Sequence, residues 1–530
     1  MAKETAAQRV ERIKRTKDGL DVLDDILHYA QTGQEIDPDD IDRFKWYGLY
    51  TQNKSLQADD DPTLYFMLRV KLLGGLVTDD QLKTLAEISR DFARDTADFT
   101  TRQDVQFHWI EVKNLPEIFD RLQKAGLTTQ MAAGDCPRNI VSCPVNGLDP
   151  KESADVRSIV RQINQLFDQK KRLFSNLPRK FKISVCGCHK HCTNPEIHDL
   201  SFVATPNDRH SDIFSVMVGG GLAKNKRFAT HIGYAYAHQL PEIAEAVAVI
   251  FRDYGNRENR TKARLRHLID AWGVEHFKNI LENKILGYKL IKGSSHHLTP
   301  YPVRSHFGVH PSKEIGYNYI GCSVSTSGVG SGGLFSLYEI LKRIGATAIR
   351  ITPTQDFIVT DVPEHKTVEA VSLLQEAGFT PFPSAFRSKT MACTGLKYCK
   401  FAISETKDRA EEIVKYLEKR FPDFKEPISI SVNGCPNSCA HPHIVDIGLM
   451  GTIVKQDDIR HQGFELLFGG YLEGEDRSEF AVKSGIKVAP EDAAKVIGDI
   501  IEEYLGSNYI SFRHYIKERF YEPETISAAS

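Results

Sequence analysis

The sequence presents the same order of segments twice, and this internal repeat constrains the fold more than any other feature. Each copy is predicted to contain a strand, a glycine-containing turn, a helix and a second strand. These elements are expected at residues 65–70, 74–75, 79–94 and 100–112 in the first copy, and at residues 318–325, 334–344 and 350–362 around a glycine-rich turn in the second. Short connections between such elements indicate a small α+β half-domain that is present twice.

The repeat continues into cysteine-containing segments. The first copy runs through GDCPRNIVSC (134–143), a predicted helix near 156–174, a strand at 181–185 and CGCHKHC (186–192). The second copy runs through ACTGLKYC (392–399), a helix near 406–420, a strand at 428–432 and NGCPNSC (433–439). Two related, pseudo-symmetric halves account for this order best, and the overall class is α+β.

Composition excludes several classes of protein. The chain has 530 residues, enough for two to four domains, and its net charge of −2 gives no support to a nucleic-acid binder. No apolar run approaches the ~18 residues of a membrane helix, and the charged N-terminal stretch has no signal-peptide core. Ten cysteines without an export signal indicate a reducing compartment, so we expect a cytoplasmic protein whose clustered thiols bind metal or take part in catalysis.

Four cysteines in the second half have the pattern C-x5-C … C-x3-C: Cys393, Cys399, Cys435 and Cys439. Four thiolates are the ligand set of an iron–sulfur cluster. A helix with Ser404 as its predicted N-cap would add partial positive charge near the anionic sulfurs. The alternative is a structural zinc site, although C-x5-C fits zinc knuckles poorly.

With these motifs, from FKWYGLY (44–50) to beyond Gly470, the chain resembles the assimilatory sulfite and nitrite reductases, which carry sirohaem coupled to a 4Fe–4S cluster. The resemblance implies that Cys393, Cys399, Cys435 and Cys439 hold the cluster, and that Cys439 also ligates the sirohaem iron. It further implies a ferredoxin-like half-domain and an α/β sirohaem- and cluster-binding domain in each half.

The expected division of the chain follows from the repeat and the resemblance. It comprises an N-terminal helical arm (1–60), the first ferredoxin-like half-domain (61–130), a sirohaem and substrate-pocket domain with a helical connector (131–300), the second half-domain (301–385) and a cluster- and sirohaem-binding domain (386–530). The stretch FKWYGLY (44–50) is too aromatic for a bare linker, so we expect it to pack against another part of the protein.

Three stretches of the first half match the family's anion pocket: TTRQDVQFHW, GDCPRNIVSC and NLPRKFKISV. The matching cations are Arg102, Arg138, Lys180 and Lys182, which would hold a small oxyanion and deliver protons to it. Lys180 and Lys182 alternate along a predicted strand and therefore share one face. Each of the four, taken singly, could equally be an ordinary surface cation.

The resemblance implies six-electron reduction of sulfite to sulfide, or of nitrite to ammonia, with electrons from ferredoxin or a similar small carrier. Lys180-Phe181-Lys182 is typical of sulfite-reducing members and favours sulfite, whereas the loop NPEIHDLSFV (194–203) is similar to the nitrite branch. A basic stretch, RENRTKARLRH (257–267), is either a landing patch for the carrier or a solvated helix face. The G-x-G-x-x-G of Gly328, Gly330 and Gly333 lies in a repeat unit that binds no nucleotide, so we reject a dinucleotide site.

A second set of thiols has no role in the resemblance. Cys136, Cys143, Cys188 and Cys192 are predicted to occupy the repeat-equivalent positions of the four cluster cysteines, and they are either buried packing residues or a second metal or cluster site. Cys322 stands alone and is predicted to be a core residue. A haem-free iron–sulfur carrier or sensor, or a zinc-stabilised structural protein, would use cysteines but would not need the four pocket cations.

Overall fold

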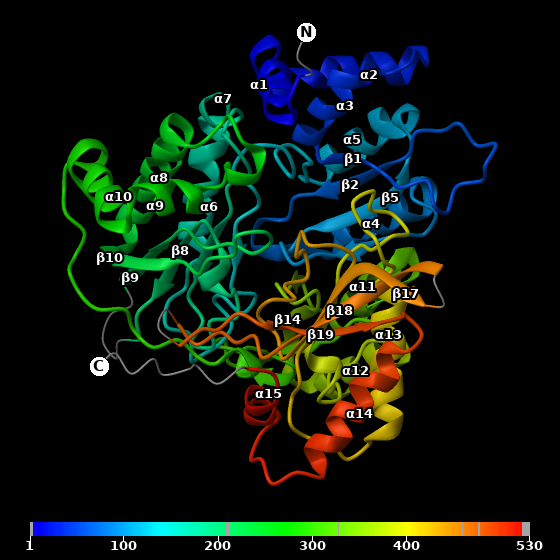
Figure 1. Ribbon diagram of the computed structural model, residues 1–530. Helices are drawn as coiled ribbons and strands as arrows, with labels where there is room; N and C mark the ends of the chain where they lie inside the picture. The colour runs from blue at the N-terminus through cyan, green and yellow to red at the C-terminus, as the bar shows by residue number, and fades with distance from the viewer. Residues whose placement is uncertain (1–3, 207–211, 327, 457–458, 475–476, 522–530) are drawn as a thin grey trace. The chain divides into compact units, whose positions relative to one another are not determined.

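The computed structural model describes residues 4–206, 212–326, 328–456, 459–474 and 477–521, and Figure 1 shows their arrangement into helices and sheets. The chain separates into two compact units, one of residues 1–382 with 473–476 and the other of residues 383–472 with 477–530. The described residues form four sheets, three of them in the first unit. Helix and sheet are mixed throughout, and the predicted α+β class is confirmed.

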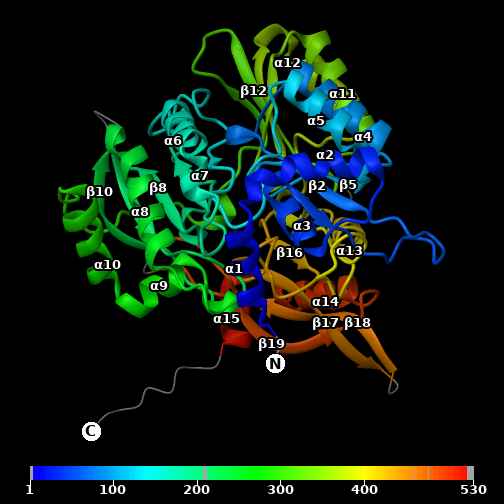
Figure 2. The same ribbon diagram turned by 90° about the horizontal axis from the view of Figure 1, so that it is seen from above.

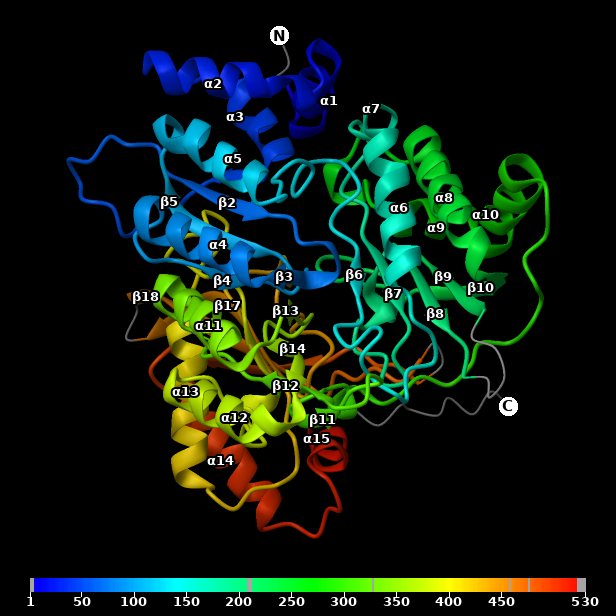
Figure 3. The same ribbon diagram turned by 180° about the vertical axis from the view of Figure 1, so that it is seen from behind.

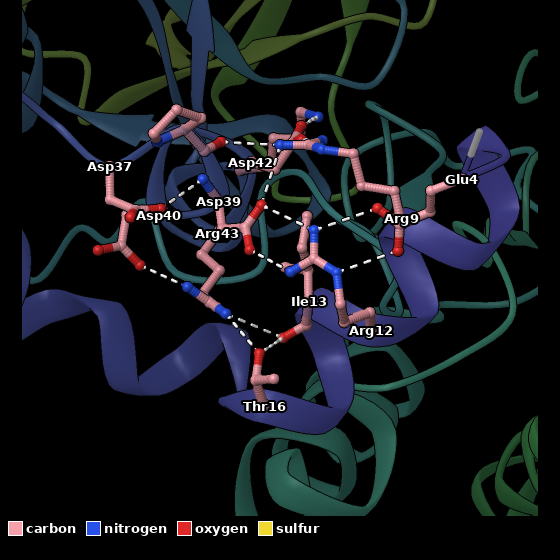
Figure 4. Close-up of polar contacts among 12 residues, drawn as sticks. Glu4, Arg9, Arg12, Ile13, Thr16, Asp37, Asp39, Asp40, Asp42 and Arg43 are labelled. Atoms are coloured by element: carbon pink, nitrogen blue, oxygen red, sulfur yellow. Dashed lines mark hydrogen bonds and ion pairs between the residues drawn. The ribbon is translucent and has the colours of Figure 1, made fainter. Parts of the chain in front are cut away.

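The N-terminal arm contains three α-helices: α1 (Ala6–Thr16), α2 (Leu23–Thr32) and α3 (Pro38–Arg43). Helix α3 begins at Pro38, because proline at the first turn starts a helix instead of breaking one. Figure 4 shows the contacts that hold α1 to α3, in which Arg9 and Arg12 reach the carboxylates of Asp39 and Asp42.

The aromatic stretch after α3 packs into the core, as predicted. Phe44 and Leu49 are fully buried, and Trp46 is nearly so. The indole N–H of Trp46 donates to the Ser175 carbonyl oxygen at 2.8 Å. The stretch therefore ties the arm to the body of the first unit.

Two sheets in the first unit have the same strand order, as the sequence repeat predicts. The first has the order β1-β2-β5-β4 and the second β11-β12-β14-β13, with β3 added at its edge. The strands are β1 (Leu49–Thr51), β2 (Phe66–Val70), β3 (Leu76–Thr78), β4 (Asp98–Phe99), β5 (Val105–Ile110), β11 (Gly308–Pro311), β12 (Tyr317–Cys322), β13 (Ala348–Ile351) and β14 (Phe357–Pro363). The helices of these two copies are α4 (Asp79–Phe92), α5 (Leu115–Lys124), α11 (Gly330–Ile344) and α12 (Thr367–Glu376), and α4 lies beside α11 (Figure 3).

The predicted single strands 100–112 and 350–362 are wrong in one respect, because each region is a hairpin. TRQD (101–104) and PTQD (353–356) form the turns, in which Gln103 and Gln355 adopt left-handed backbone conformations (φ 58° and 69°). The two glutamines make reciprocal contacts between the copies. The Gln103 amide donates to the Ile351 carbonyl oxygen at 2.8 Å, and the Gln355 amide donates to that of Phe99 at 3.2 Å.

The other two sheets also share one topology, although one belongs to each unit. Each begins with three parallel strands and continues with two antiparallel ones, in the orders β6-β7-β8-β9-β10 and β15-β16-β17-β18-β19. The first sheet consists of β6 (Val141–Ser142), β7 (Ile183–Cys186), β8 (Leu200–Ala204), β9 (Ile213–Val218) and β10 (Thr230–Tyr236). The second consists of β15 (Thr390–Ala392), β16 (Ile430–Asn433), β17 (Ile447–Gln456), β18 (Ile459–Phe468) and β19 (Val482–Val488).

Helices pack on these sheets through apolar faces. Those on the first are α6 (Arg157–Gln169), α7 (Lys171–Phe174), α8 (Leu240–Tyr254), α9 (Leu265–Trp272) and α10 (Val274–Ile280), several of which line up beside β8–β10 (Figure 2). Those of the second unit are α13 (Lys407–Arg420), α14 (Ala493–Leu505) and α15 (Phe512–Phe520). The predicted helix near 156–174 is interrupted at Lys170. No helix within the described residues is long and apolar enough to cross a lipid bilayer.

Candidate active site and metal centres

The four predicted cluster cysteines gather at the ends of two parallel strands in the second unit. Cys393 follows β15 directly, Cys399 lies in the next turn, and Cys435 and Cys439 lie in the loop after β16. The Gly434 N–H donates to the Cys393 sulfur at 3.2 Å, which joins the two loops at a thiol. A Cβ atom at Gly434 would lie 2.7 Å from the Ser404 carbonyl oxygen, so this close approach requires glycine.

The thiols lie within electrostatic reach of one another. Burial, together with the neighbouring Cys439, raises the pKa of Cys393 to about 12 and that of Cys435 to about 11. Without a positive ion, these sulfurs are therefore held as thiols. Cys439 is exposed, whereas Cys435 is buried and Cys393 and Cys399 are partly buried.

The four cysteines on these two loops offer the donor set of an iron–sulfur cluster. Among the residues that the structure describes, the group of cysteine and histidine donors that converges within 4.8 Å is a different one, in the first unit. A cluster of four irons spreads its ligand sulfurs further apart than one ion does. The cysteines 393, 399, 435 and 439 thus fit a 4Fe–4S cluster by donor type, by proximity and by their N–H donor.

The helix beside these thiols begins slightly later than predicted. The N-cap of α13 is Thr406, not Ser404, whose hydroxyl donates to the Gly463 carbonyl oxygen at 2.6 Å. The Glu405 carboxylate accepts from the Lys407 N–H at 3.0 Å, and the Thr406 hydroxyl donates to the Cys393 carbonyl oxygen at 2.6 Å. The positive end of the α13 dipole therefore lies next to Cys393, as the sequence indicated.

The four predicted pocket cations lie together in the first unit. Arg102 is in the β4–β5 turn, Arg138 follows Cys136, and Lys180 and Lys182 flank the fully buried Phe181. Burial, together with the charge of Arg138, lowers the pKa of Arg102 to about 9. Burial and then the charge of Lys182 hold the pKa of Lys180 well below its usual range, with Arg138 contributing as well.

Arg102 carries the clearest sign of an incomplete site. One guanidinium nitrogen, Nη2, donates to the Asn139 carbonyl oxygen, but Nε and Nη1 are buried and have no hydrogen-bond partner. Arg138, in contrast, donates to the Gly134 carbonyl oxygen at 2.7 Å and to the Tyr50 hydroxyl at 3.5 Å. Buried cationic donors without acceptors are costly unless an anion binds them. The residues thus fit an anionic group such as the carboxylates of sirohaem or a small oxyanion.

Sequence analysis missed the residues that support these cations. Asp199 accepts from the Lys182 N–H at 2.8 Å and pairs with Arg264 at 2.7 Å, and Asp135 pairs with Arg260 at 2.6 Å. The arginines at the end of the stretch 257–267 do not form a solvated helix face, because Arg264 is 11% exposed at the side chain and Arg266 is buried. The landing patch for the carrier stays a prediction. The dense run of arginines could have indicated buried ion pairs. Their partners, Asp135 and Asp199, lie too far away in the sequence to be identified from it.

The strand register pairs the cysteines of the two halves differently from the prediction. Ser142 pairs with Val185 in β6 and β7, and Ala392 pairs with Val432 in β15 and β16. Cys143 therefore corresponds to Cys393, and the predicted equivalence of Cys136 with a cluster ligand is wrong. Cys136 lies apart from the group, with its thiol 2.9 Å from the Ala133 carbonyl oxygen. Cys322 is a fully buried core residue, as predicted.

The glycine-rich turn before α11 uses its backbone amides within the protein. The N–H groups of Val329 and Gly330 both donate to the Ala97 carbonyl oxygen, at 2.9 and 3.2 Å. These amides therefore hold the second copy of the half-domain to the first.

Comparison with known proteins agrees with this geometry. The family model described as the nitrite and sulphite reductase 4Fe–4S domain matches residues 133–287 and 384–518, and that of the ferredoxin-like half domain of the same enzymes matches residues 58–125. Sulfite reductase (ferredoxin) 2 of Mycolicibacterium paratuberculosis is 37% identical over 92% of this chain and 88% of its own length. Ferredoxin–nitrite reductase of Synechococcus elongatus is 33% identical over 96% of this chain and 99% of its own.

Among solved structures, the Mycobacterium tuberculosis NirA protein superposes with a TM-score of 0.89 at 34% identity and covers 96% of both chains. Family membership implies sirohaem and a 4Fe–4S cluster as cofactors, which sets aside the haem-free carrier and the zinc-stabilised structural protein. The chain belongs to the nitrite and sulfite reductase family of oxidoreductases.

Proposed function

We propose that this protein is a cytoplasmic, ferredoxin-dependent sulfite reductase that reduces sulfite to sulfide with six electrons. The single observation that carries the proposal is the buried Arg102 guanidinium, whose Nε and Nη1 have no hydrogen-bond partner and which lies near the charge of Arg138, in a chain of this family. A carrier or sensor that only passes electrons would gain nothing from such a group, because its cost is recovered only when an anion binds.

The cations have two tasks. The free Nε and Nη1 donors of Arg102 and the ammonium groups of Lys180 and Lys182 bind the negative oxygens of the substrate or of the sirohaem carboxylates. The lowered pKa of Lys180 makes it a better proton donor than an ordinary lysine, and each substrate oxygen must leave as water after protonation. Sirohaem, when bound, supplies the redox-active iron for this chemistry.

We propose that Cys393, Cys399, Cys435 and Cys439 would hold the 4Fe–4S cluster and that Cys439 would also bind the sirohaem iron. Its exposure supports the second role, because a thiol that must reach a second iron centre cannot be enclosed by its own loop. A shared sulfur would also shorten the electron path between the two cofactors.

Two observations favour sulfite over nitrite as the substrate. Lys180 and Lys182 lie on either side of the buried Phe181, so two ammonium groups are directed to the same anion, as in the sulfite-reducing pattern. The sulfite reductases among the relatives are 36–37% identical to this chain, and the nitrite reductases are 29–33% identical. Reduction of nitrite to ammonia is the alternative, favoured by the loop 194–203.

The test is steady-state kinetics on the anaerobically purified, cofactor-loaded protein. Reduced ferredoxin is the electron donor, and sulfide and ammonia are measured with sulfite or nitrite as substrate. We expect a higher kcat/KM for sulfite and the Soret and red absorption bands of sirohaem. A higher kcat/KM for nitrite would assign the alternative activity, and a preparation without a tetrapyrrole would refute both.

A further inference from the structure

The first unit contains a second group of converging metal-binding side chains, separate from the proposed cluster cysteines. Cys143, Cys188, Cys192 and His306 are all buried, and their donor atoms all lie within 4.8 Å of one another. The Cys143 and Cys192 sulfurs are 3.6 Å apart, and the Cys188 sulfur is 3.2 Å from Nε2 of His306. We propose that these four residues bind one tetrahedral zinc ion.

The distances select a single ion over an iron–sulfur cluster. A tetrahedral zinc ion with Zn–S bonds of about 2.3 Å holds its sulfurs about 3.8 Å apart, and a histidine nitrogen about 3.6 Å from each sulfur. The observed separations of 3.6 and 3.2 Å fit a shell of that size. A 4Fe–4S cluster would not fit between sulfurs this close together.

The strand register explains why the two halves hold different metals. Cys143 occupies the place of Cys393, and the loop of Cys188 and Cys192 after β7 occupies that of Cys435 and Cys439 after β16. The first half has no cysteine in the place of Cys399. Its fourth donor is His306, which comes from the segment before β11 and brings a nitrogen close to the three sulfurs. Three thiolates and one imidazole form one of the standard donor sets of structural zinc.

The loop around Cys188 has the backbone geometry of a thiolate ligand. The N–H of Lys190, two residues further on, donates to the Cys188 sulfur at 3.2 Å. Such N–H donors stabilise negative charge on sulfur. In the other half, the Asn437 N–H has the same relation to Cys435 and lowers its pKa. Both loops are therefore shaped to present sulfur to a cation.

The segment that precedes His306 is held to the cysteine loop by three contacts. Arg304 and Glu196 form a fully buried ion pair at 2.6 Å. The Thr299 N–H donates to Nδ1 of His191 at 2.9 Å, and the Lys190 ammonium donates to the Ser305 carbonyl oxygen at 2.8 Å. These contacts fix His306 beside Cys188 independently of any metal, so the site is preorganised.

A small cavity borders the group and is lined by Cys192, Arg304 and His306 together with residues of β12 and β14. It gives an ion access to the donors from one side. The ion would join three segments far apart in sequence, at β6, at β7 and before β11. The proposed role is therefore structural: zinc holds the second half-domain to the first α/β sheet, and all four donors are used, so no position is left open for substrate.

The decisive measurement is the metal content of the full-length protein, purified anaerobically, incubated with excess zinc and passed through a desalting column. We expect about one zinc per chain in addition to about five irons and four acid-labile sulfides, and a zinc X-ray absorption spectrum of about three sulfurs and one nitrogen. Less than half a zinc per chain, a spectrum without sulfur, or about eight sulfides would overturn the proposal. A Cys143–Cys192 disulfide in the anaerobic protein would do the same.

Matched variants assign the site to these residues. Cys188→Ser should lower the zinc content at least tenfold. Cys186→Ser changes a buried cysteine at the end of β7 that lies outside the group, and it should leave the zinc content unchanged. His306→Cys should retain zinc, with four sulfurs in the absorption spectrum, and His306→Ala should bind it more weakly. Equal zinc in Cys188→Ser and the unchanged protein would refute the assignment. Iron and sirohaem contents report on the proposed function separately, so the two proposals can fail independently.

Discussion

Lys182 can be exchanged without moving the main chain that carries it, because Asp199 accepts the Lys182 N–H at 2.8 Å whichever side chain is present. Removal of its ammonium leaves Lys180 as the remaining lysine on this face, beside the buried Phe181. We expect Lys182→Asn to shift the ratio of kcat/KM for nitrite to that for sulfite by roughly tenfold toward nitrite, which is about 1.4 kcal/mol of relative transition-state binding.

The control for this change is Lys182→Arg, which keeps the positive charge and should keep the preference for sulfite. Steady-state rates with both anions give the ratio directly. If Lys182→Asn and the unchanged protein show the same ratio, the two lysines do not set the preference.

Single residues also show where sequence reasoning ends. Arg102, Arg138, Lys180 and Lys182 were named from local motifs, and the structure places them close together, because each motif is tied to a strand end or turn of the repeat. His306 was missed because it lies more than a hundred residues from Cys188 and belongs to no local pattern. The sequence alone paired Cys136 with a cluster cysteine. Only the register of β6 with β7 shows that Cys143, and not Cys136, corresponds to Cys393.

At the scale of elements, helix α1 is attached to the body of the first unit by a buried carboxylate. The Lys14 ammonium lies 3.5 Å from the Asp135 carboxylate, and Arg260 binds the same group at 2.6 Å. Burial raises the pKa of Asp135, but the charges of Arg260, Lys14 and Arg179 outweigh it and hold the pKa well below its usual range. A carboxyl with a depressed folded-state pKa stabilises the fold above its unfolded value near 4, and this contribution is lost as pH falls.

Asp135→Asn should therefore destabilise the first unit at pH 7 by about 3 kcal/mol, because three cations lose a buried counter-charge. The difference from the unchanged protein should shrink as pH falls from 5 toward 3, because the Asp135 carboxyl takes up a proton in the unfolded chain over this range while it stays ionised in the folded protein. Thermal unfolding across this pH range and hydrogen exchange in α1 measure the effect. Asp39→Asn, at a more exposed pair with Arg12, should cost less than 1 kcal/mol. A pH-independent difference for Asp135→Asn would contradict the explanation.

The half-domains depend on each other through the two turn glutamines. Gln103 is fully buried: its amide donates to the Ile351 carbonyl oxygen at 2.8 Å, and its side-chain oxygen accepts from the Ser142 N–H at 2.7 Å. Gln355 is partly buried and makes the longer, 3.2 Å bond to Phe99. Asparagine tolerates the left-handed backbone of both residues but has a shorter reach.

Gln103→Asn should therefore lower the unfolding free energy by about 2 kcal/mol or more, since it leaves a buried N–H and a buried carbonyl without partners. Gln355→Asn is the matched variant and should cost about 1 kcal/mol or less. Thermal or urea unfolding of both proteins gives the comparison. Equal losses at the two positions would show that burial of the contact does not decide its contribution.

The elements themselves were largely predictable, and their pairing was not. The spacing of apolar residues predicted β2, α4, β12 and α11 because each buries one regular face. The first hairpin turn was missed because TRQD has neither glycine nor proline, and Gln103 supplies the left-handed conformation. The pairing of β3 with β13 joins residues 76–78 to 348–350, and local propensity carries no information about such a distant partner.

At the scale of the whole molecule, one topology is used twice with different chemistry. The half that contains β6–β10 bears the pocket cations and the converging group of Cys143, Cys188, Cys192 and His306. The half that contains β15–β19 bears the four thiols of Cys393, Cys399, Cys435 and Cys439, of which Cys439 is exposed. Similar strand ends and loops thus position ligands in both halves, and the identity and spacing of a few side chains determine what each half binds.

This division predicts the consequence of changing Cys439. Serine is a much poorer ligand for iron than cysteine thiolate, and the exposed position allows the change without loss of core packing. We expect Cys439→Ser to fold, to retain the zinc of the first half, and to lose sirohaem and at least 100-fold in sulfite reduction. Cys322→Ser serves as the control, since Cys322 is a buried core residue outside both groups, and it should lower stability but leave the cofactor spectrum intact. Visible absorption, iron and sulfide content and rates with reduced ferredoxin distinguish the outcomes. A fully coloured and active Cys439→Ser protein would show that the sulfur of residue 439 does not join the two cofactors.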